Sequence, residues 1–510
     1  MADNTEQITM KPQPVLSGRR EILTSLEQIT EQNVTKMLQD AFIKHRANVS
    51  EIEYLYRYYK GIQPVLWRTK DVRPEICNHI VENRANAIVT FRVGYTVGKP
   101  IQYISSVSDE DVSAAIAKLN DMMRVVGKAR KDKELVEWQM IGGTAYRLAL
   151  PTEKKNARIP FDLYTVDPRQ AFVVYRNDIA HTPLAGVYYT IDEQQNYTFY
   201  VYTDDMYYKV QGWQSGKVIE AKQHQMRHIP LIEYPLNMAR LGAFEVVLPL
   251  LDGLNDLESN RIDSVAQFVQ SLLIAINCQF DDGVTANTIR EAGMVAIKSI
   301  GENKADLKVI SESLDQQQTQ TLKQAILDAI YEIAGIPSQS NGNTSDSSNN
   351  GAVILKNGWQ GAETRAQDFE MMFSGPEHEF IELVVDICNG LSDFNLDPEN
   401  VEPKFTRRNY EDILSKSQTL TTMLNNEKIH PQCAYEACGL FVDTQDAYNM
   451  GMDWYEQNQK RLQEQQERQL QQQQQQQGQP EEQPDEQPDE EAPAEAGTNQ
   501  GHYVKGYWKK

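Results

Sequence analysis

The residues of this chain that could do chemistry are few and widely spaced. His224 and His228 stand four residues apart, which on a helix would place two metal ligands on one face. Pro230 follows closely and disfavours helical geometry before it, and no Cys, Asp or Glu lies between residues 222 and 231. The histidine pair therefore indicates a solvated turn or strand edge rather than a metal site.

The acidic pairs and the cysteines offer no better site. Asp281-Asp282-Gly283 lacks the alternating oxygens and the terminal Glu of a calcium loop, and Asp204-Asp205 is typical of a turn. The five cysteines are scattered, and the one close pair, Cys433 and Cys438, has no second pair beside it. Disulfides and zinc sites are therefore not expected.

The sequence motifs of common catalytic sites are missing as well. The chain has no Gly-x-x-x-x-Gly-Lys-Ser/Thr phosphate loop, no Gly-x-Gly-x-x-Gly after a predicted strand, no Gly-x-Ser-x-Gly and no His-Glu-x-x-His. We therefore expect no catalytic residues, no metal and no cofactor, and a protein that is not an enzyme.

The composition narrows the class of protein further. The 50 Lys and Arg residues against 72 Asp and Glu give a formal net charge of −22. A protein that binds nucleic acid of any sequence tightly needs a basic surface to attract the phosphates. The acidic net charge therefore excludes that class of protein. The chain opens without a signal peptide and has no run of about 18 apolar residues, so we expect a soluble protein without a membrane partner.

The sequence pattern predicts a mainly helical α+β chain, whose helices and strands must position any functional residue. Residues 1–25 are polar and expected to be mobile, and helical spacing of apolar residues follows. Helices are expected near 49–60, 75–92, 109–126 and 131–142. Between residues 145 and 234, β-branched and aromatic runs separated by turn signals predict an antiparallel meander. Its strands are expected at 172–175, 186–191, 197–203 and 207–210.

Residues 244–276 form the most informative segment. Their apolar residues make one stripe at helical spacing, which predicts an amphipathic helix about 50 Å long that begins or kinks near Pro249. A second helix is expected to end at Gly335-Ile336-Pro337, with a small α/β insertion between the two, including strands at 294–297 and 307–310. The residues expected to pack these helices are Leu250, Leu254, Leu257, Ile262, Phe268, Leu272, Ile326 and Ile330.

The C-terminal third alternates between polar and helical segments. Residues 338–351 contain no apolar side chain, so they form either a mobile linker or a functional loop. Helical spacing resumes at residue 353, with an interruption expected at Ser374-Gly375-Pro376. Residues 409–460 predict short helices, and the Gln- and acid-rich residues 461–510 predict a disordered tail that continues from a helix.

Several strings of the chain, taken in order, resemble one family: the portal proteins of tailed double-stranded DNA bacteriophages, of the type found in siphophages of Gram-positive bacteria. The resemblance covers residues 50–400 and lacks a counterpart for Pro249 and for the tail. Its blocks are Tyr58-Tyr59-Lys60-Gly61, Asn78-His79-Ile80-Val81-Glu82-Asn83, residues 94–101, Val166-Asp167-Pro168 with 171–175, and Leu250-Leu251-Asp252-Gly253-Leu254-Asn255 with the rest of the long helix.

This resemblance implies a portal-type subunit that assembles into a ring. The subunit would have a wing, long stem helices, a small α/β clip and a helical crown. The implied boundaries are 1–25 for the mobile N-terminus, 26–238 for the wing, 239–276 for the stem helix, 277–317 for the clip, 318–337 for the second stem helix, 338–351 for the tunnel loop, 352–408 for the wing helices, 409–460 for the crown and 461–510 for the tail.

The function implied by the resemblance is a ring of twelve subunits at one capsid vertex, through which double-stranded DNA is packaged and ejected. The implied partners are the terminase large subunit, which supplies the energy, the major capsid and scaffolding proteins, and a head-completion or adaptor protein. The implied location is the virion, and the host cytoplasm during assembly. The alternative is a scaffold or adaptor protein that holds another protein with its helix hairpin and never meets DNA.

The resemblance also assigns candidate contact residues. The tunnel loop would offer weak, exchangeable hydrogen bonds to moving DNA from Ser338, Ser340, Asn341, Asn343, Thr344, Ser345, Ser347, Asn349, Asn350 and Gly351. The cations nearest the proposed clip and stem are candidates for contact with DNA or with acidic groups of a partner. They are Lys298, Lys304, Lys308 and Lys323.

Overall fold

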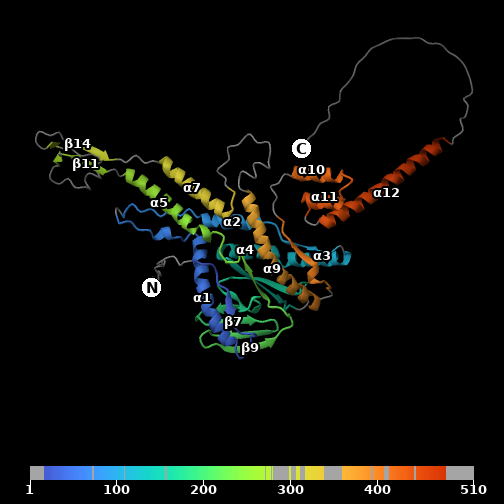
Figure 1. Ribbon diagram of the computed structural model, residues 1–510, viewed down its shortest axis with the longest axis horizontal. Coiled ribbons are helices and arrows are strands. Elements are labelled where there is room, and N and C mark those ends of the chain that lie inside the picture. The colour runs from blue at the N-terminus through green and yellow to red at the C-terminus, as the bar shows by residue number, and fades with distance from the viewer. Residues whose placement is uncertain are drawn as a thin grey trace, which may run out of the picture. The chain divides into compact units, whose positions relative to one another are not determined.

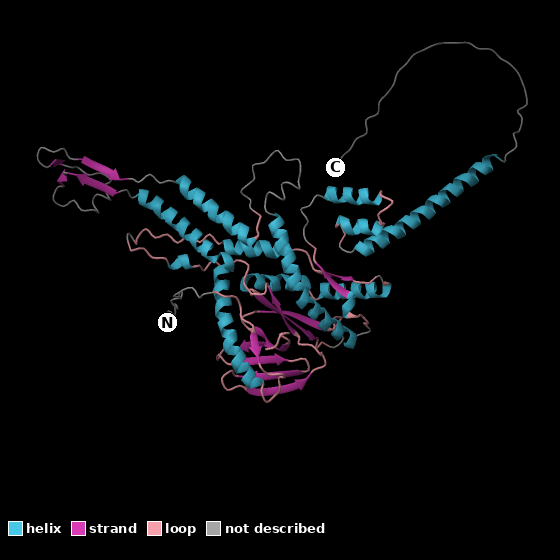
Figure 2. Ribbon diagram, viewed as in Figure 1, coloured by secondary structure: helices cyan, strands magenta, loops and turns pink. Residues whose placement is uncertain are grey.

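The computed structural model divides into two compact units, residues 1–443 and residues 444–510, which are described separately (Figure 1). It describes residues 16–71, 74–107, 109–154, 158–269, 272–276, 278–279, 298–299, 306–310, 316–337, 359–391, 394–406, 413–441 and 444–477. The predicted tunnel loop, strand 294–297 and most of the tail lie outside these residues. Helices and small sheets alternate along the chain, which confirms the predicted mainly helical α+β class (Figure 2).

Four α-helices lie before residue 143 of the first unit. They are α1 (Val34–Tyr59), α2 (Arg84–Thr96), α3 (Glu110–Val125) and α4 (Lys128–Gly142), with the short 3-10 helix η1 (Pro64–Trp67) after α1. The Asp109 side chain caps α3 by accepting hydrogen bonds from the amides of Asp111 and Val112. The prediction of a helix over 75–92 was wrong in its start, because Asn83 caps α2 and the preceding residues are not helical.

The predicted antiparallel meander is confirmed and is larger than expected. Its order is β1-β5-β6-β7-β8-β9, with β1 parallel to β5 at one edge and the other pairs antiparallel. The strands are β1 (Ile22–Thr24), β5 (Ala171–Arg176), β6 (Pro183–Ile191), β7 (Tyr197–Tyr202), β8 (Met206–Gln211) and β9 (Lys217–Gln223). A second sheet, β10-β3-β4, contains β3 (Thr144–Pro151), β4 (Phe161–Val166) and β10 (Leu231–Pro235), and β2 (Gln102–Ser105) pairs with β15 (Val401–Lys404).

The tyrosines of the meander cover both faces of the sheet. Tyr189 and Phe199 face α1, where the ring of Phe42 meets them edge-on at centroid distances of 5.3 and 5.1 Å. Tyr188 and Tyr200, one residue along each strand, stack on the opposite face at 4.6 Å. These aromatic rings therefore serve sheet packing.

Residues 16–24, expected to belong to a mobile N-terminus, are held against the body. Strand β1 adds to the sheet, and the buried Arg19 guanidinium pairs with Glu51 at 3.0 Å and Glu245 at 2.6 Å. The backbone of Gly18, at φ +83°, lies so close to the carbonyl of Ala239 that a Cβ would clash. A buried ion pair and a strand pairing therefore fix this segment.

Helix α9 (Trp359–Leu391) continues through Pro376, so the predicted interruption at 374–376 was wrong. Phe373 and Phe380, on either side of the proline, are completely buried, and so is Glu377. Packing on both sides of the proline compensates for the one backbone hydrogen bond that its ring removes.

The predicted helix pair is α5 (Leu248–Val269) and α7 (Gln316–Ala334), which lie side by side. Pro249 lies in the first turn of α5, where a missing amide costs nothing, so the helix begins there rather than kinking. The predicted end of α5 at 276 was wrong. Leu272 begins strand β11 (Leu272–Ile276), which pairs with β14 (Asp306–Ile310). The prediction failed here because a short apolar run suits a strand as well as a helix.

The remaining elements of the first unit are short strands and short helices. The predicted strand at 307–310 is confirmed within β14, and a two-residue pair joins β12 (Cys278–Gln279) to β13 (Lys298–Ser299). Short 3-10 helices η2 (Glu245–Val247) and η3 (Pro398–Asn400) precede α5 and β15, and α10 (Ile413–Leu424) and α11 (Pro431–Cys438) form a helix pair. None of the helices in the described ranges has the length and apolar character needed to cross a membrane.

The second unit consists of α12 (Thr444–Gln477) in its described part. The prediction of disorder from residue 461 was wrong for 461–477, since glutamine favours helix and Arg468 lies 3.9 Å from Glu464 one turn earlier. Its first half carries the exposed side chain of Trp454, with the Arg461 guanidinium 5.5 Å from the indole ring.

Candidate functional site in the stem helices

One face of α5 is polar and yet buried. We call Asp252, Asn255, Ser259 and Asp263 the polar ladder; their spacing of three, four and four residues places them on one side of the helix. Asn255, Ser259 and Asp263 are each at most 1% exposed. The first rung, Asp252, accepts a hydrogen bond of 2.8 Å from the Tyr58 hydroxyl.

The other three rungs bind the backbone of a non-helical segment, residues 78–82. Alternate amides of this segment donate to Asp263 Oδ1 at 2.7 Å, Ser259 Oγ at 3.0 Å and Asn255 Oδ1 at 2.8 Å. Two residues of extended chain advance about 6.6 Å and four residues of helix about 6.0 Å, so the two repeats match over three rungs. The ladder therefore fixes the register of α5 along this segment.

The last rung is also the most strongly charged. Lys70 Nζ lies 2.5 Å and Arg68 Nη2 3.1 Å from Asp263 Oδ2. Burial raises the pKa of Asp263, but hydrogen bonds from Lys70 and Asn78 outweigh it and lower the pKa to about 2. Asp263 is therefore ionised at neutral pH and ties two separate parts of the 68–82 loop to the helix.

Sequence reasoning missed the ladder. It considered only the apolar stripe of this helix and gave no role to Asp252, Asn255, Ser259 or Asp263. The available signal was that the polar residues repeat every three or four positions, the same spacing that marks the apolar stripe. Buried polar side chains are hydrogen-bonded, so a regular polar repeat on a buried side of a helix indicates hydrogen-bond partners elsewhere in the chain.

The helices α5 and α7 are joined by Lys323, one of the four candidate lysines. Its ammonium lies 2.9 Å from Glu258 on α5 and 3.1 Å from Glu82 in the loop. Burial lowers the pKa of Lys323, but the hydrogen bonds that its ammonium donates to Glu258 and Glu82 outweigh burial and raise the pKa. Within one subunit this lysine is therefore a link between the two stem helices.

The predicted packing residues of the stem divide into buried and exposed. Leu254 and Ile330 are completely buried, and Leu250 and Ile326 pack partly on the same core. Leu257 is half-buried, whereas Ile262 is 43% exposed. Phe268 lies on α5 and Leu272 on β11. Further exposed apolar side chains of the pair are Val265 (43%), Leu322 (52%) and Ile333 (41%).

Of the other candidate contact residues, two lie on described strands and eleven lie outside the described residues. Lys298 and Lys308 lie on β13 and β14, across from Gln279 and Ile274. Lys304 and the ten candidate residues of the tunnel loop lie outside the described residues.

The histidine pair does not converge on a common point. His224 Nε2 lies 3.1 Å from the Thr203 carbonyl, and His228 Nε2 lies 2.9 Å from Asp386 Oδ2. Across the described ranges, no group of three or more His, Cys, Asp and Glu side chains could hold a metal ion.

Lys128, Asp132, Arg147 and Glu377 form a buried charge cluster in the body. The Lys128 ammonium lies 2.7 Å from Asp132 and 2.8 Å from Glu377, and Arg147 pairs with both acids. Burial raises the pKa of Glu377, but Arg147 and Lys128 outweigh it and lower the pKa to about 2. Because these four side chains are at most 3% exposed, the cluster joins elements and offers no access to a substrate.

Comparison with known proteins agrees with the sequence resemblance. The family described as "Phage portal protein, SPP1 Gp6-like" matches residues 40–477. No curated protein matches the chain. Two solved structures are similar over 70% of this chain and 90% of theirs, each at 12% identity: the neck of an empty GTA particle computed with C6 symmetry (TM-score 0.42) and the neck of the native GTA particle computed with C12 symmetry (TM-score 0.40). Since the family match spans most of the sequence, this chain belongs to the SPP1 Gp6-like family of phage portal proteins.

Proposed function

We propose that this chain assembles into a ring of twelve copies at one vertex of a phage capsid, and that double-stranded DNA is packaged and ejected through the axial channel of the ring. The observation that carries the proposal is the family match over residues 40–477. The ring would act as a conduit, while a separate ATPase, the terminase large subunit, supplies the energy. The finished ring would belong to the virion, after assembly in the host cytoplasm.

The stem supports assembly with copies of the same chain. Leu322 and Ile333 are eleven residues apart, about three turns, and so lie on one face of α7. Both are more than 40% exposed, as are Ile262 and Val265 on α5. Several exposed apolar side chains on one helix pair indicate an interaction surface. In a closed ring of identical copies, each subunit would cover this surface of its neighbour.

The composition of residues 338–351 supports their role as the tunnel loop. Each phosphate that a protein neutralises with Lys or Arg adds about 0.9 to the salt dependence of binding, so a strongly basic lining would hold DNA in place. Residues 333–355 contain no Lys or Arg, and the loop consists of Ser, Asn, Thr, Gly, Gln and Asp. Such side chains offer weak hydrogen bonds that exchange as DNA moves.

The remaining assignments follow from the family and are part of the proposal. Residues 277–317 would form the clip that meets the terminase large subunit during packaging and the head-completion or adaptor protein afterwards. The wing, 26–238 with 352–408, and the crown, 409–460, would face the major capsid and scaffolding proteins and the packaged DNA.

Negative-stain images of the purified protein test the proposal. The wild type is expected to form rings with a central hole, and Leu322→Lys is expected to prevent ring formation because it places a charge in the stem contact. Ile219→Lys on β9 is the matched control, since Ile219 is 53% exposed and Leu322 52%. Wild-type monomers or fibres would favour the adaptor alternative. Intact rings of Leu322→Lys would show that this face of α7 takes no part in the contact between subunits.

A further inference from the structure

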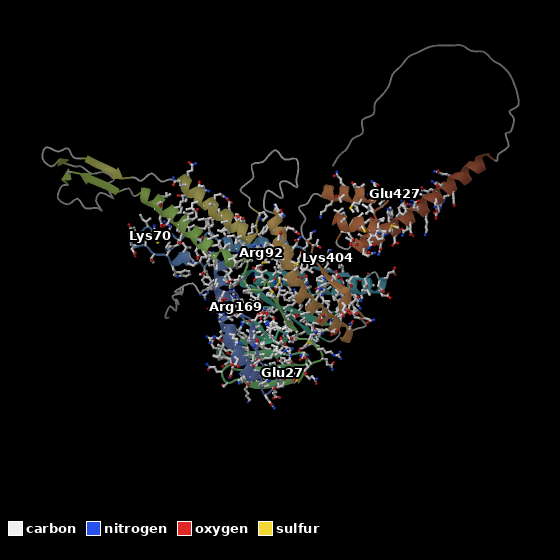
Figure 3. All side chains as sticks on the ribbon, viewed as in Figure 1. Glu27, Lys70, Arg92, Arg169, Lys404 and Glu427 are labelled. Carbon is white, nitrogen blue, oxygen red and sulfur yellow. The ribbon has the colours of Figure 1, made fainter. Side chains whose placement is uncertain are left out.

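A groove of about 350 Å³ lies between the end of α2 and the start of α4, and we call it the α2–α4 groove. It begins just after Arg92, which is labelled in Figure 3. Much of its lining is apolar, because Val93, Val97, Pro100 and Ala129 contribute to it. The two valines are buried, whereas Pro100 and Ala129 are exposed. The groove therefore presents an apolar surface that is accessible from solvent.

Positive charges lie beside this apolar surface. Arg130 and Lys133 of α4 belong to the lining and are exposed. Lys99, also exposed, lies in the chain directly before the lining residue Pro100. We call Lys99, Arg130 and Lys133 the cationic edge. The carboxylate of Glu134 lies 3.3 Å from Arg130, so these four side chains keep a net positive charge. A complementary ligand would combine a small apolar group with carboxylates.

The two glycines of the lining differ in what requires them. A Cβ on Gly98 would lie 2.1 Å from the carbonyl oxygen of Gly94, so the backbone itself requires a glycine at 98. Gly94 lies in the last turn of α2, and its Cβ would meet none of the described residues within 4 Å beyond its own stretch of helix. Glycine weakens a helix, so a helical glycine that packing does not require indicates space kept for a ligand.

The sequence that follows α12 contains a segment with the complementary chemistry. Residues 479–490 read Gln-Pro-Glu-Glu and then Gln-Pro-Asp-Glu twice, which makes three repeats of one pattern. These twelve residues carry six carboxylates and no Lys or Arg. Each repeat offers one proline ring followed by two carboxylates. Proline also fixes its own backbone angle, so it loses little freedom when it binds.

We propose that residues 479–490 of a neighbouring copy bind in the α2–α4 groove of each subunit. The ring of one proline contacts the apolar lining beside Gly94, and the carboxylates that follow it pair with the cationic edge. Helix α12 has 34 residues and is about 50 Å long, so it is a spacer that can carry the repeats to another copy. Three equivalent repeats on one tail raise the effective concentration of the ligand at the groove. The inference rests on the proposed function, which places copies side by side in a ring.

Carbodiimide cross-linking of purified full-length rings tests this inference. The reagent joins a lysine amine to a carboxylate that it contacts, as an amide, and mass spectrometry of the digested protein identifies the pair. Cross-links from Lys99 and Lys133 to acids of residues 479–490 are expected in excess over those from Lys217, an exposed lysine on β9. Gly94→Leu is expected to lose this excess, because the new side chain occupies the groove while every amine and carboxylate remains.

Two further variants control for the change at Gly94. Gly375→Leu on α9 is the matched control, since Gly375 is exposed and a Cβ there would likewise meet no described residue within 4 Å outside its own helix segment. It is expected to keep the wild-type cross-links. A tail variant with Pro480→Ala, Pro484→Ala and Pro488→Ala keeps every charge, changes no residue of α2 or α4, and is expected to lose most of the excess. Wild-type yields in the tail variant or in Gly94→Leu, or equal yields at Lys217, would overturn the inference.

Co-expression of two variants shows which copy supplies the tail. One variant carries Lys99→Gln and Lys133→Gln. The other lacks the six carboxylates of residues 479–490, through Glu481→Gln, Glu482→Gln, Asp485→Asn, Glu486→Gln, Asp489→Asn and Glu490→Gln. In mixed rings these cross-links can form only between different copies, and they are expected to form. Their absence from mixed rings would mean that each tail binds its own chain, which would overturn the inference. Absence of rings in the wild type would instead overturn the proposed function.

Discussion

The buried charge cluster of the body and the polar ladder of the stem both place polar side chains in the interior, but they bind different partners. In the cluster, Lys128 and Arg147 pair with two carboxylates, so side chain meets side chain and the charges cancel. In the ladder, three side chains of α5 accept hydrogen bonds from the backbone amides of residues 78–82.

The difference in partners implies a difference in what each set specifies. A pair of long charged side chains can form over a range of backbone positions, so the cluster specifies which elements meet: α4, β3 and α9. Backbone amides recur at a fixed interval, so the ladder specifies how far α5 is advanced along the loop. The cluster therefore contributes mainly to stability, and the ladder mainly to the position of the stem.

The largest effect is expected in the charge cluster. Glu377→Gln keeps the size of the side chain but leaves the charges of Lys128 and Arg147 with one acid, Asp132. Removing one partner of a buried ion pair costs about 3–5 kcal/mol, so the thermal unfolding midpoint is expected to fall strongly. Glu382→Gln, on the exposed side of the same helix, is the control and is expected to leave the midpoint unchanged. Equal midpoints for both variants would show that the cluster contributes little to stability.

An intermediate effect is expected at the charged end of the ladder. Asp263→Asn removes the charge that binds Lys70 and Arg68, and hydrogen bonds to charged groups contribute about 1.5–3 kcal/mol each. The folded pKa of Asp263, about 2, lies below the usual value of about 3.9. Its stabilising contribution is therefore complete above about pH 4 and is lost as the pH falls toward 2.

Unfolding curves over a pH series distinguish this effect from a general acid effect. The stability difference between the wild type and Asp263→Asn is expected to be constant near neutral pH and to shrink below about pH 4. Asp256→Asn, on the exposed side of α5, is expected to match the wild type throughout. A difference that stays constant down to pH 2 would mean that the ionised carboxylate is not what stabilises the loop.

The comparison also explains which features the sequence could predict. The meander was predictable because its strands are runs of β-branched and aromatic residues separated by turn signals, and the family was predictable because its motifs occur in order. The end of α5 was not, since the apolar run at 272–276 fits a helix and a strand equally until its partner at 306–310 is known.

The buried polar sites escaped prediction because their partners are remote in sequence. Ser259 meets an amide 179 residues away, and Arg147 meets a carboxylate 230 residues away. Hydrophobic periodicity identifies which side of a helix is apolar, but it does not identify a polar side that finds a partner elsewhere.

The smallest effect is expected at the centre of the ladder, and it would separate the two roles most directly. Ser259→Ala removes the acceptor of the Ile80 amide and leaves that buried N–H without its partner, at a cost of about 1 kcal/mol. The amide of Ile80 is expected to exchange its hydrogen faster, because the segment opens locally more often. Amides of the charge cluster, such as that of Arg147, are expected to exchange at the wild-type rate. Ser264→Ala, further along α5 and outside the ladder, serves as the control because the Ser264 hydroxyl donates to the Asn260 carbonyl of its own helix. Faster exchange at both Ile80 and Arg147 in Ser259→Ala would mean that the ladder supports the whole body and not only the position of the stem.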